Sequence, residues 1–158
     1  MLIYLAGGLF NAGQRLHNLV LEKYLKELGH TVILPQRRAL DYWDGEKFST
    51  KGIVADCARY CADPTVVYVG NIDGPDADDG TAVEYGIAIA KTGRAVIYRT
   101  DFRTAEDREL GINAMFGMPG TKFLYPPCLF TELDEWEDYY RNLAGAIDGA
   151  IRTLRPSL

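Results

Sequence analysis

Residues 63–93 decide the fold of this chain and read DPTVVYVGNIDGPDADDGTAVEYGIAIAKTG. The run 65–69 consists of β-branched and aromatic residues, which are typical of a buried strand. Residues 71–80 contain a Gly-Pro pair and four aspartates, which favour turns and solvated backbone. The next residues predict a helix, because one apolar face is formed at helical spacing by Ala82, Val83, Gly86, Ile87 and Ala90. The stretch therefore predicts a strand, an acidic loop and a helix, which is half of a parallel βαβ unit.

Asp78 and Glu84 stand where ligands bind in such units, beyond the carboxyl end of the strand and near the amino end of the helix. Asp78 or Asp79 is expected to cap the helix, and Glu84 to lie one turn further, away from the apolar face. A purely structural explanation is also open. Aspartate is a favoured N-cap, and a glutamate in the first turn gains about 0.3–1 kcal/mol from the helix dipole.

Strands and helices are predicted to alternate along the rest of the chain. Further strands are expected at 1–6, 31–34, 95–98 and 122–125, and helices at 12–28, 50–62 and 133–154. In the helix 50–62, the residues expected to face inward are Ile53, Val54, Cys57 and Tyr60. Residues 37–51 have no steady period, which favours an irregular cover over a site. The pattern predicts a single domain over 1–158 with a flavodoxin-like or Rossmann-like three-layer α/β sandwich of about five parallel strands.

Composition limits the partners. The chain has 158 residues, 47% of them hydrophobic, and a net charge of −5, which argues against nucleic acid and for small molecules or proteins as partners. Its three cysteines lack companion ligands at zinc spacing, so they are expected to be reduced thiols and no metal site is expected. No stretch reaches the roughly 20 apolar residues that span a bilayer. We therefore expect no membrane contact and a cytoplasmic location.

Several motifs, taken in order, resemble the nucleoside 2-deoxyribosyltransferase family. They are YLAGGLF at 4–10, Asp63, DGP at 73–75, DDGTAVEYG at 78–86, RTDFR at 99–103 and NAM at 113–115. Their order and spacing cover most of the chain. The first turn departs from the family, which more often has Gly-Pro where this chain has Gly7-Gly8. The tail 155–158 has no aromatic or chelating group that matches a family feature.

The resemblance implies double displacement at the anomeric carbon of a 2′-deoxynucleoside, without a cofactor. Glu84 matches the carboxylate nucleophile, which forms a covalent deoxyribosyl-enzyme, and Asp78 matches the acid and base that serves the departing and entering bases. Tyr4 matches a tyrosine that holds the nucleophile, and Asp63 matches an aspartate of the base-binding region.

The resemblance also implies an assembly. Asn113 and Met115 match residues that a neighbouring subunit contributes to the sugar end of the site, so a homo-oligomer, a dimer or larger, is expected. The remaining substrate-binding positions are Gly7, Phe10 and Gly80. The substrates implied are a 2′-deoxynucleoside and a free nucleobase, with a role in nucleoside salvage. Gln36 and Trp43 are further candidates to face the base, and purine and pyrimidine preference stay open.

Two alternative functions remain. An N-glycoside hydrolase of nucleosides or nucleoside 5′-monophosphates would use water in place of the second base. A 5′-phosphate needs backbone N–H groups with hydroxyl or Arg donors at a helix start, and the turn 7–10 has no Ser or Thr. A non-catalytic nucleotide-binding module would place an anionic phosphate beside four aspartates, which is electrostatically unfavourable.

Overall fold

A computed structural model of the chain describes residues 1–103 and 112–154. Five parallel strands form one sheet in the order β2-β1-β3-β4-β5, and their bounds are β1 Leu2–Ala6, β2 Thr31–Ile33, β3 Val66–Asn71, β4 Ala95–Tyr98 and β5 Thr121–Leu124. Every neighbouring pair is parallel, with Tyr4 level with both Ile33 and Tyr68. This strand order is that of the flavodoxin-like fold, which confirms the predicted architecture.

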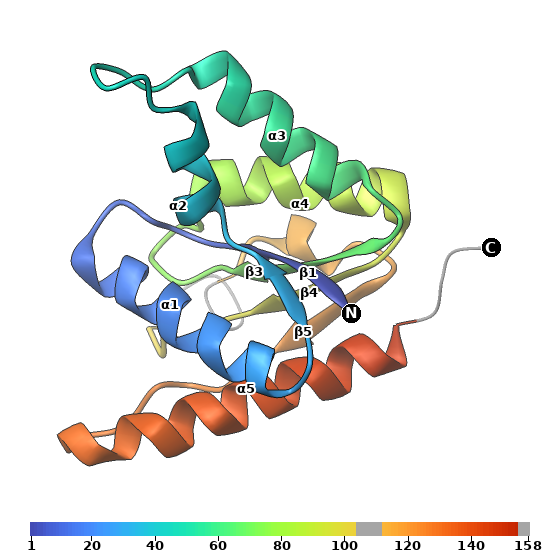
Figure 1. Cartoon of the computed structure of the whole chain (residues 1–158). Helices are drawn as coiled ribbons and strands as arrows, with labels where there is room; N and C mark the ends of the chain where they lie inside the picture. The colour runs from blue at the N-terminus through green and yellow to red at the C-terminus, as the bar shows by residue number, and fades with distance from the viewer. Residues whose placement is uncertain (104–111, 155–158) are drawn as a thin grey trace.

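Helices cover both faces of the sheet (Figure 1). The helices are α1 Ala12–Glu27, α2 Pro35–Arg38, α3 Thr50–Ala62, α4 Asp79–Thr92 and α5 Trp136–Thr153, with 3-10 turns at Ala39–Tyr42, Ala114–Gly117 and Leu133–Glu135. Helices α1 and α5 bury one core against Ile3, Leu5 and Val69. Helices α3 and α4 bury the other against Tyr4, Tyr68 and Ile97. Alternate residues of each strand thus feed two cores, as expected for a sheet that is buried on both faces.

Two predictions about helix faces are wrong. Val83, expected on the apolar face of α4, is 64% exposed, and the buried positions are Thr81, Tyr85, Ala88 and Thr92. Val54 of α3 is 61% exposed. The polar groups on the buried face of α4 are compensated, because the Tyr85 hydroxyl donates to the Phe116 carbonyl and the Tyr68 hydroxyl donates to the Thr81 carbonyl.

An irregular cover is predicted at 37–51, but its first part is helical, as are the two residues before it. Residues 35–42 form α2 and a 3-10 turn directly after β2, where Pro35 occupies the first helical position. Trp43 and Phe48 pair across the following loop, with ring centroids 4.7 Å apart. This segment passes over the carboxyl end of the sheet beside α3 (Figure 1).

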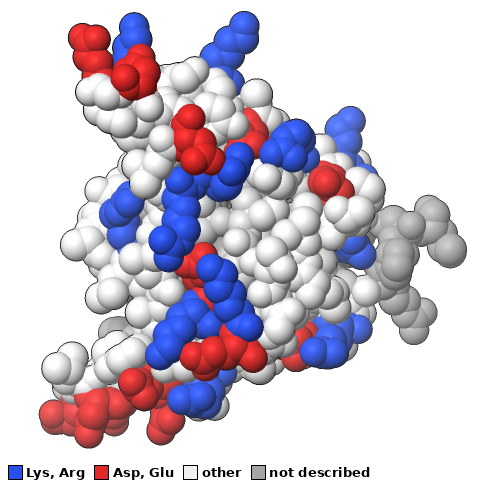
Figure 2. All heavy atoms as spheres, viewed as in Figure 1, with Lys and Arg blue, Asp and Glu red and all other residues white. Residues whose placement is uncertain are grey.

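Charges of both signs share the visible surface (Figure 2). Acidic side chains gather where α5 begins, and its first turn carries Glu137 and Asp138. Several basic side chains are paired with acidic ones, including Arg37 with Glu22 and Arg59 with Asp56. Among the described residues no helix is long and apolar enough to cross a membrane.

Candidate active site

The first candidate pair joins β1 to α4. The Tyr4 hydroxyl donates a hydrogen bond of 2.7 Å to Oε1 of Glu84. Tyr4 is 1% exposed in the sheet core, so its ring is fixed and its hydroxyl holds the carboxylate from a rigid strand. Strand β1 ends at Ala6, and α4 begins at the same edge of the sheet after β3, its neighbour. The two residues are 80 positions apart in sequence and are brought together by this topology.

Asp78 is the N-cap of α4, which is one of the two positions that the sequence offers for the cap. Its Oδ2 accepts hydrogen bonds of 2.9 Å from both the backbone N–H and the hydroxyl of Thr81. These bonds satisfy one of the free N–H groups at the helix start and fix the carboxylate in place. Glu84 lies six residues further along, so one helix carries both carboxylates.

The pKa of Glu84 is raised above its ordinary value. Burial is the largest cause, and the negative charge of Asp78 adds to it, whereas hydrogen bonds from Tyr4 and Cys57 oppose the rise. Burial also raises the pKa of Tyr4, and the neighbouring Glu84 charge raises it further. Tyr4 therefore stays protonated and remains a donor to the carboxylate at neutral pH.

Both carboxylates line a cavity of about 550 Å³ whose other walls are largely apolar. Of the predicted substrate-binding residues, Gly7, Phe10 and Gly80 also line it, together with Leu40, Tyr42, Phe48 and Ile53. The cavity lies on the α3–α4 side of the β1–β3 boundary, where the strand order reverses. In open α/β sheets this switch point is the usual ligand site.

Asp56 and Arg38, which were not candidates from the sequence, also line this cavity. Asp56, 7% exposed, accepts a bond of 3.1 Å from Arg38 and one of 2.6 Å from Arg59. Burial alone raises the pKa of Asp56, but the two guanidinium groups outweigh burial and lower it overall. Gln36, a candidate from the sequence, also lines the cavity, and it accepts a hydrogen bond from the Asn18 amide and donates one to the Arg15 carbonyl. The sequence signal for Asp56 is a charged residue on the inward side of α3 that is followed three positions later by an arginine.

Asp63 does not join this site. It is the C-cap of α3, and its carboxylate accepts bonds of 2.8 and 2.7 Å from Thr65, immediately before β3. In a parallel sheet the start of β3 is at the opposite edge from the loop that carries Asp78. The base contact expected for Asp63 therefore has no geometric support, and Asp56 is the aspartate that the structure brings to the cavity.

A second cavity, of about 500 Å³, lies on the α1–α5 side of the same edge. Its walls are more polar than those of the first cavity and include Asp78, Asn18, Gln14 and His17. Both ring nitrogens of His17 are 2.8 Å from tyrosine hydroxyls, those of Tyr140 and Tyr98. Burial lowers the pKa of His17, so its imidazole is neutral. Asp78 is shared by the two cavities.

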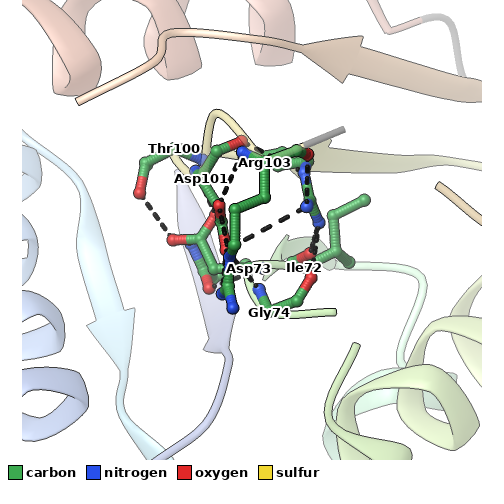
Figure 3. Close-up of polar contacts among 8 residues, drawn as sticks. Ile72, Asp73, Gly74, Thr100, Asp101 and Arg103 are labelled. Atoms are coloured by element: carbon green, nitrogen blue, oxygen red, sulfur yellow. Dashed lines mark hydrogen bonds and ion pairs between the residues drawn. The ribbon is translucent and has the colours of Figure 1, made fainter. Parts of the chain in front are cut away.

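The acidic loop between the cavities is held by the loop that follows β4 (Figure 3). The Asp73 carboxylate accepts bonds from the backbone N–H groups of Thr100 and Asp101, from the Thr100 hydroxyl and from the Asn71 amide. Arg99, 2% exposed, donates to the carbonyls of Ile72 and Gly74. We call Asp73, Arg99, Thr100 and Asp101 the loop anchor. It fixes the segment that leads into Asp78.

Asn113 and Met115 lie outside both cavities. Asn113 is exposed and caps the turn Ala114–Gly117 by accepting a bond from the Met115 N–H, and Met115 is 62% exposed. Asn113 also lines a small space of about 20 Å³ against Pro75 and Ala77 of the acidic loop. Residue 111 of this glycine- and methionine-rich segment and the tail 155–158 lie outside the described residues.

The fold and site together define a flavodoxin-like α/β protein with two carboxylates in a cavity at its switch point. The family model described as nucleoside 2-deoxyribosyltransferase matches residues 3–115, more than half of the chain. The chain therefore belongs to the nucleoside 2-deoxyribosyltransferase family, which confirms the resemblance seen in its motifs. Membership supports a function of the deoxyribosyltransferase type.

Solved structures agree on the fold. A 2-deoxyribosyltransferase from the psychrotolerant bacterium Bacillus psychrosaccharolyticus is similar with a TM-score of 0.58 and 23% identity, over 100% of both chains. A conserved protein from Enterococcus faecalis V583 is similar with a TM-score of 0.60 and 23% identity, over 90% of this chain and 98% of the other. No curated protein sequence matches the chain.

Proposed function

We propose that this protein transfers the 2-deoxyribosyl group of a 2′-deoxynucleoside from one nucleobase to another through a covalent ester on Glu84. The observation that carries the proposal is the 2.7 Å bond from Tyr4 to Glu84 at the wall of a cavity that Asp78 also lines. One oxygen of the Glu84 carboxylate is held from the sheet core, so the group is oriented before substrate binds.

In the first half-reaction, a Glu84 oxygen attacks C1′ and the bond from C1′ to the base nitrogen breaks. Asp78 passes a proton to the departing base. Because Oδ2 of Asp78 accepts both bonds from Thr81, we assign this proton transfer to Oδ1. The products are a free base and a deoxyribosyl ester of Glu84, as in retaining glycosidases.

In the second half-reaction, a nitrogen of the entering base attacks C1′ and the ester bond to Glu84 breaks. The Asp78 carboxylate takes the proton that the base nitrogen loses, which restores the starting state of both residues. Burial assists both steps, because the charge that develops on the sugar is stabilised by nearby carboxylates more strongly in a site with little water.

The apolar cavity suits the base. Phe10, Leu40 and Phe48 offer flat or branched apolar surface to an aromatic ring, and Gln36 with the Arg38–Asp56 pair offers polar groups to its edge. We therefore transfer the base-binding role expected of Asp63 to Asp56.

The polar cavity suits an uncharged sugar end. It is lined by Asp73, Asp76 and Asp78, and no Lys or Arg is among the described residues that line it. A 5′-phosphate would meet carboxylates of its own sign there. This distribution of charge favours a nucleoside with a free 5′-hydroxyl over a nucleoside 5′-monophosphate, and thus disfavours the monophosphate hydrolase.

We also propose that Asn113 and Met115 complete the site of a neighbouring subunit. In their own chain both are exposed and outside the two cavities, which supports a role across an interface. Co-expression of Glu84→Ala and Asn113→Ala chains tests this. In a two-fold dimer one site of each mixed pair receives both intact residues, so random mixing restores roughly a quarter of the sites. No recovery in mixed dimers verified by native mass spectrometry contradicts the proposal.

The reaction itself is tested by incubating the protein with deoxyinosine and free adenine or cytosine, followed by chromatography. We expect a new deoxynucleoside and free hypoxanthine in equal amounts. Release of hypoxanthine without a new deoxynucleoside would instead identify a hydrolase.

A further inference from the structure

A chain of three hydrogen-bonded side chains leads from the sheet core to the second, more polar cavity. His17 of α1 lies between a tyrosine of β4 and a tyrosine of α5, with Nε2 2.8 Å from the Tyr98 hydroxyl and Nδ1 2.8 Å from the Tyr140 hydroxyl. The imidazole is also stacked on the Tyr98 ring, with centroids 5.8 Å apart. Tyr98 is fully buried, whereas His17 and Tyr140 line the cavity. The imidazole is thus fixed between a core hydroxyl and a hydroxyl at the cavity wall.

The protons of this chain have two possible directions. Burial lowers the pKa of His17, and it raises the pKa of Tyr98 and, to about 12, that of Tyr140. At neutral pH each hydroxyl therefore keeps its proton and the imidazole carries one. A neutral imidazole has one donor and one acceptor nitrogen. Either Tyr98 donates to Nε2 and the Nδ1–H group donates to Tyr140, or both bonds run the other way.

The burial of Tyr98 decides between the two directions. Its hydroxyl makes no other hydrogen bond of ordinary geometry within residues 1–103 and 112–154. Both atoms of the adjacent Asn71 amide are bonded to Asp73. If Nε2 carried the imidazole proton, the Tyr98 proton would be buried without an acceptor, which is costly. Tyr140 is only partly buried and lines the cavity, so the favoured direction is from Tyr98 through His17 to Tyr140.

This direction makes Tyr140 a donor toward the cavity. Its oxygen accepts the bond from Nδ1 of His17, and its own proton has no acceptor in an ordinary hydrogen bond among the residues that the structure describes. The same cavity is lined by Asp76 and Asp78, whose carboxylates accept. A ligand hydroxyl needs an acceptor for its proton and a donor for its oxygen. The cavity provides both.

We propose that Tyr140 binds the 5′-hydroxyl of the deoxyribose by donating its proton to the 5′ oxygen, and that His17 is the positioning residue that directs this donor into the cavity. The inference rests on the proposed function, because it takes a deoxynucleoside as the ligand. The 5′-hydroxyl is chosen because it extends furthest from C1′, which reacts at Glu84 in the other cavity. Tyr140 lies beyond residues 3–115, the part of the chain that the family model matches.

The first test measures binding in Glu84→Gln protein, where the nucleophile is absent. Calorimetric titration with 2′-deoxyinosine should give a Kd about five- to tenfold higher when Tyr140→Phe is added. With 2′,5′-dideoxyinosine, which lacks the 5′-hydroxyl, Tyr140→Phe should leave the Kd unchanged. An equal loss of affinity for both ligands, or no loss for either, overturns the inference.

Tyr139→Phe is the matched control for this titration. Tyr139 is the neighbouring tyrosine of α5, but its hydroxyl donates to the Pro126 carbonyl and it is not among the residues that line either cavity. The Kd for both ligands should stay at the value of the Glu84→Gln parent. Circular dichroism checks that each variant is folded.

The second test determines the tautomer of His17 without a ligand. The chain has two histidines, so the ¹⁵N resonances of the His17 ring are assigned by their loss in His17→Phe. Protonated and unprotonated ring nitrogens have widely separated ¹⁵N shifts, and we expect the proton on Nδ1. A proton on Nε2 overturns the positioning role. In folded protein, His17→Phe should also weaken 2′-deoxyinosine binding, and Tyr140→Phe should then add little to the loss.

These measurements separate the inference from the proposed function. Base exchange by wild type, together with unchanged binding in Tyr140→Phe, would refute the sugar contact and keep the transferase. Absence of exchange by wild type, together with the selective loss of 2′-deoxyinosine binding in Tyr140→Phe, would refute the transferase and keep the contact.

Discussion

Two acidic side chains at the same edge of the sheet differ in how many hydrogen bonds their carboxylate oxygens accept. Asp73, in the loop anchor, accepts four hydrogen bonds, two from backbone N–H groups and two from side chains, between 2.5 and 3.0 Å long. Glu84 faces a cavity of about 550 Å³ and accepts a hydrogen bond from the Tyr4 hydroxyl.

The difference separates structural from chemical use of a carboxylate. A group whose acceptor capacity is filled by its own chain gains stability and has none left for a ligand. A group that is buried with few donors is costly to ionise, and such a cost is typical of functional sites. Asp78 combines the two, since it caps α4 with Oδ2 while it borders both cavities.

The largest expected effect is the loss of the nucleophile. Glu84→Ala should lower base exchange at least about a thousandfold, equivalent to roughly 4 kcal/mol of transition-state stabilisation, while circular dichroism shows an intact fold. The measurement is the rate of new deoxynucleoside formation. Turnover close to wild type in the folded variant would show that Glu84 is not the nucleophile.

Substitution in the loop anchor should lower stability rather than abolish base exchange. Asp73→Ala leaves two backbone N–H groups and the Thr100 hydroxyl without their acceptor, so the free energy of unfolding should fall by about 2–4 kcal/mol in urea titrations. Thr100→Ala, which removes a single one of these bonds, is the milder control. If Asp73→Ala abolished exchange with unchanged stability, Asp73 would belong to the chemistry.

Asp56 and Asp63 sharpen the comparison in the binding site. Asp56→Asn should raise KM for the base about tenfold or change base preference, because it weakens the pair with Arg38 and Arg59 at the cavity wall. Asp63→Asn, at the opposite edge, should leave KM within about twofold. Steady-state kinetics with several acceptor bases decides between them. The reverse ranking would restore Asp63 to base binding.

The smallest effect is on stability and depends on pH. Burial raises the pKa of Glu84 in the folded chain, so folding favours its protonated form. Wild type therefore loses stability as the pH rises from the ordinary pKa of glutamate through the raised pKa of the folded state. Glu84→Gln should therefore melt at a higher temperature than wild type at pH 8, by roughly 2–4 °C for each kcal/mol that ionisation of Glu84 costs the folded state. At pH 4 the two proteins should melt at the same temperature. A Glu84→Gln protein that melts lower at pH 8 contradicts a buried, costly charge.

Much of the fold was accessible from sequence. The apolar runs at β1, β3 and β4 are buried on both faces along almost their whole length, so hydrophobicity alone identifies them. The buried face of α4 is harder to predict. Ala82, Gly86 and Ala90 are small residues, and their spacing does not identify which side of the helix packs against the sheet. Tyr85 and Thr81 are buried there because tertiary hydrogen bonds satisfy them, and these bonds cannot be read from spacing.

The site was predictable in part. Asp78 and Glu84 follow a strand and open a helix, so the topology alone places them at the ligand edge. Asp63 precedes a strand, and the same argument places it at the other edge, against the motif resemblance. Tyr4 lies on β1 and Asp56 on α3, and only folding brings these two elements to Glu84 and its cavity, so no local pattern reveals the contacts.

In the proposed reaction Glu84 becomes covalently bonded to the sugar. Mixing the protein with a 2′-deoxy-2′-fluoro-arabinosyl nucleoside tests it directly, because fluorine at C2′ destabilises an oxocarbenium-like transition state and allows the intermediate to accumulate. Peptide mass mapping should then find one fluorinated sugar on the peptide that contains Glu84, and none in Glu84→Ala. A sugar on Asp78 instead, or release of base with no adduct on any carboxylate, would contradict the account.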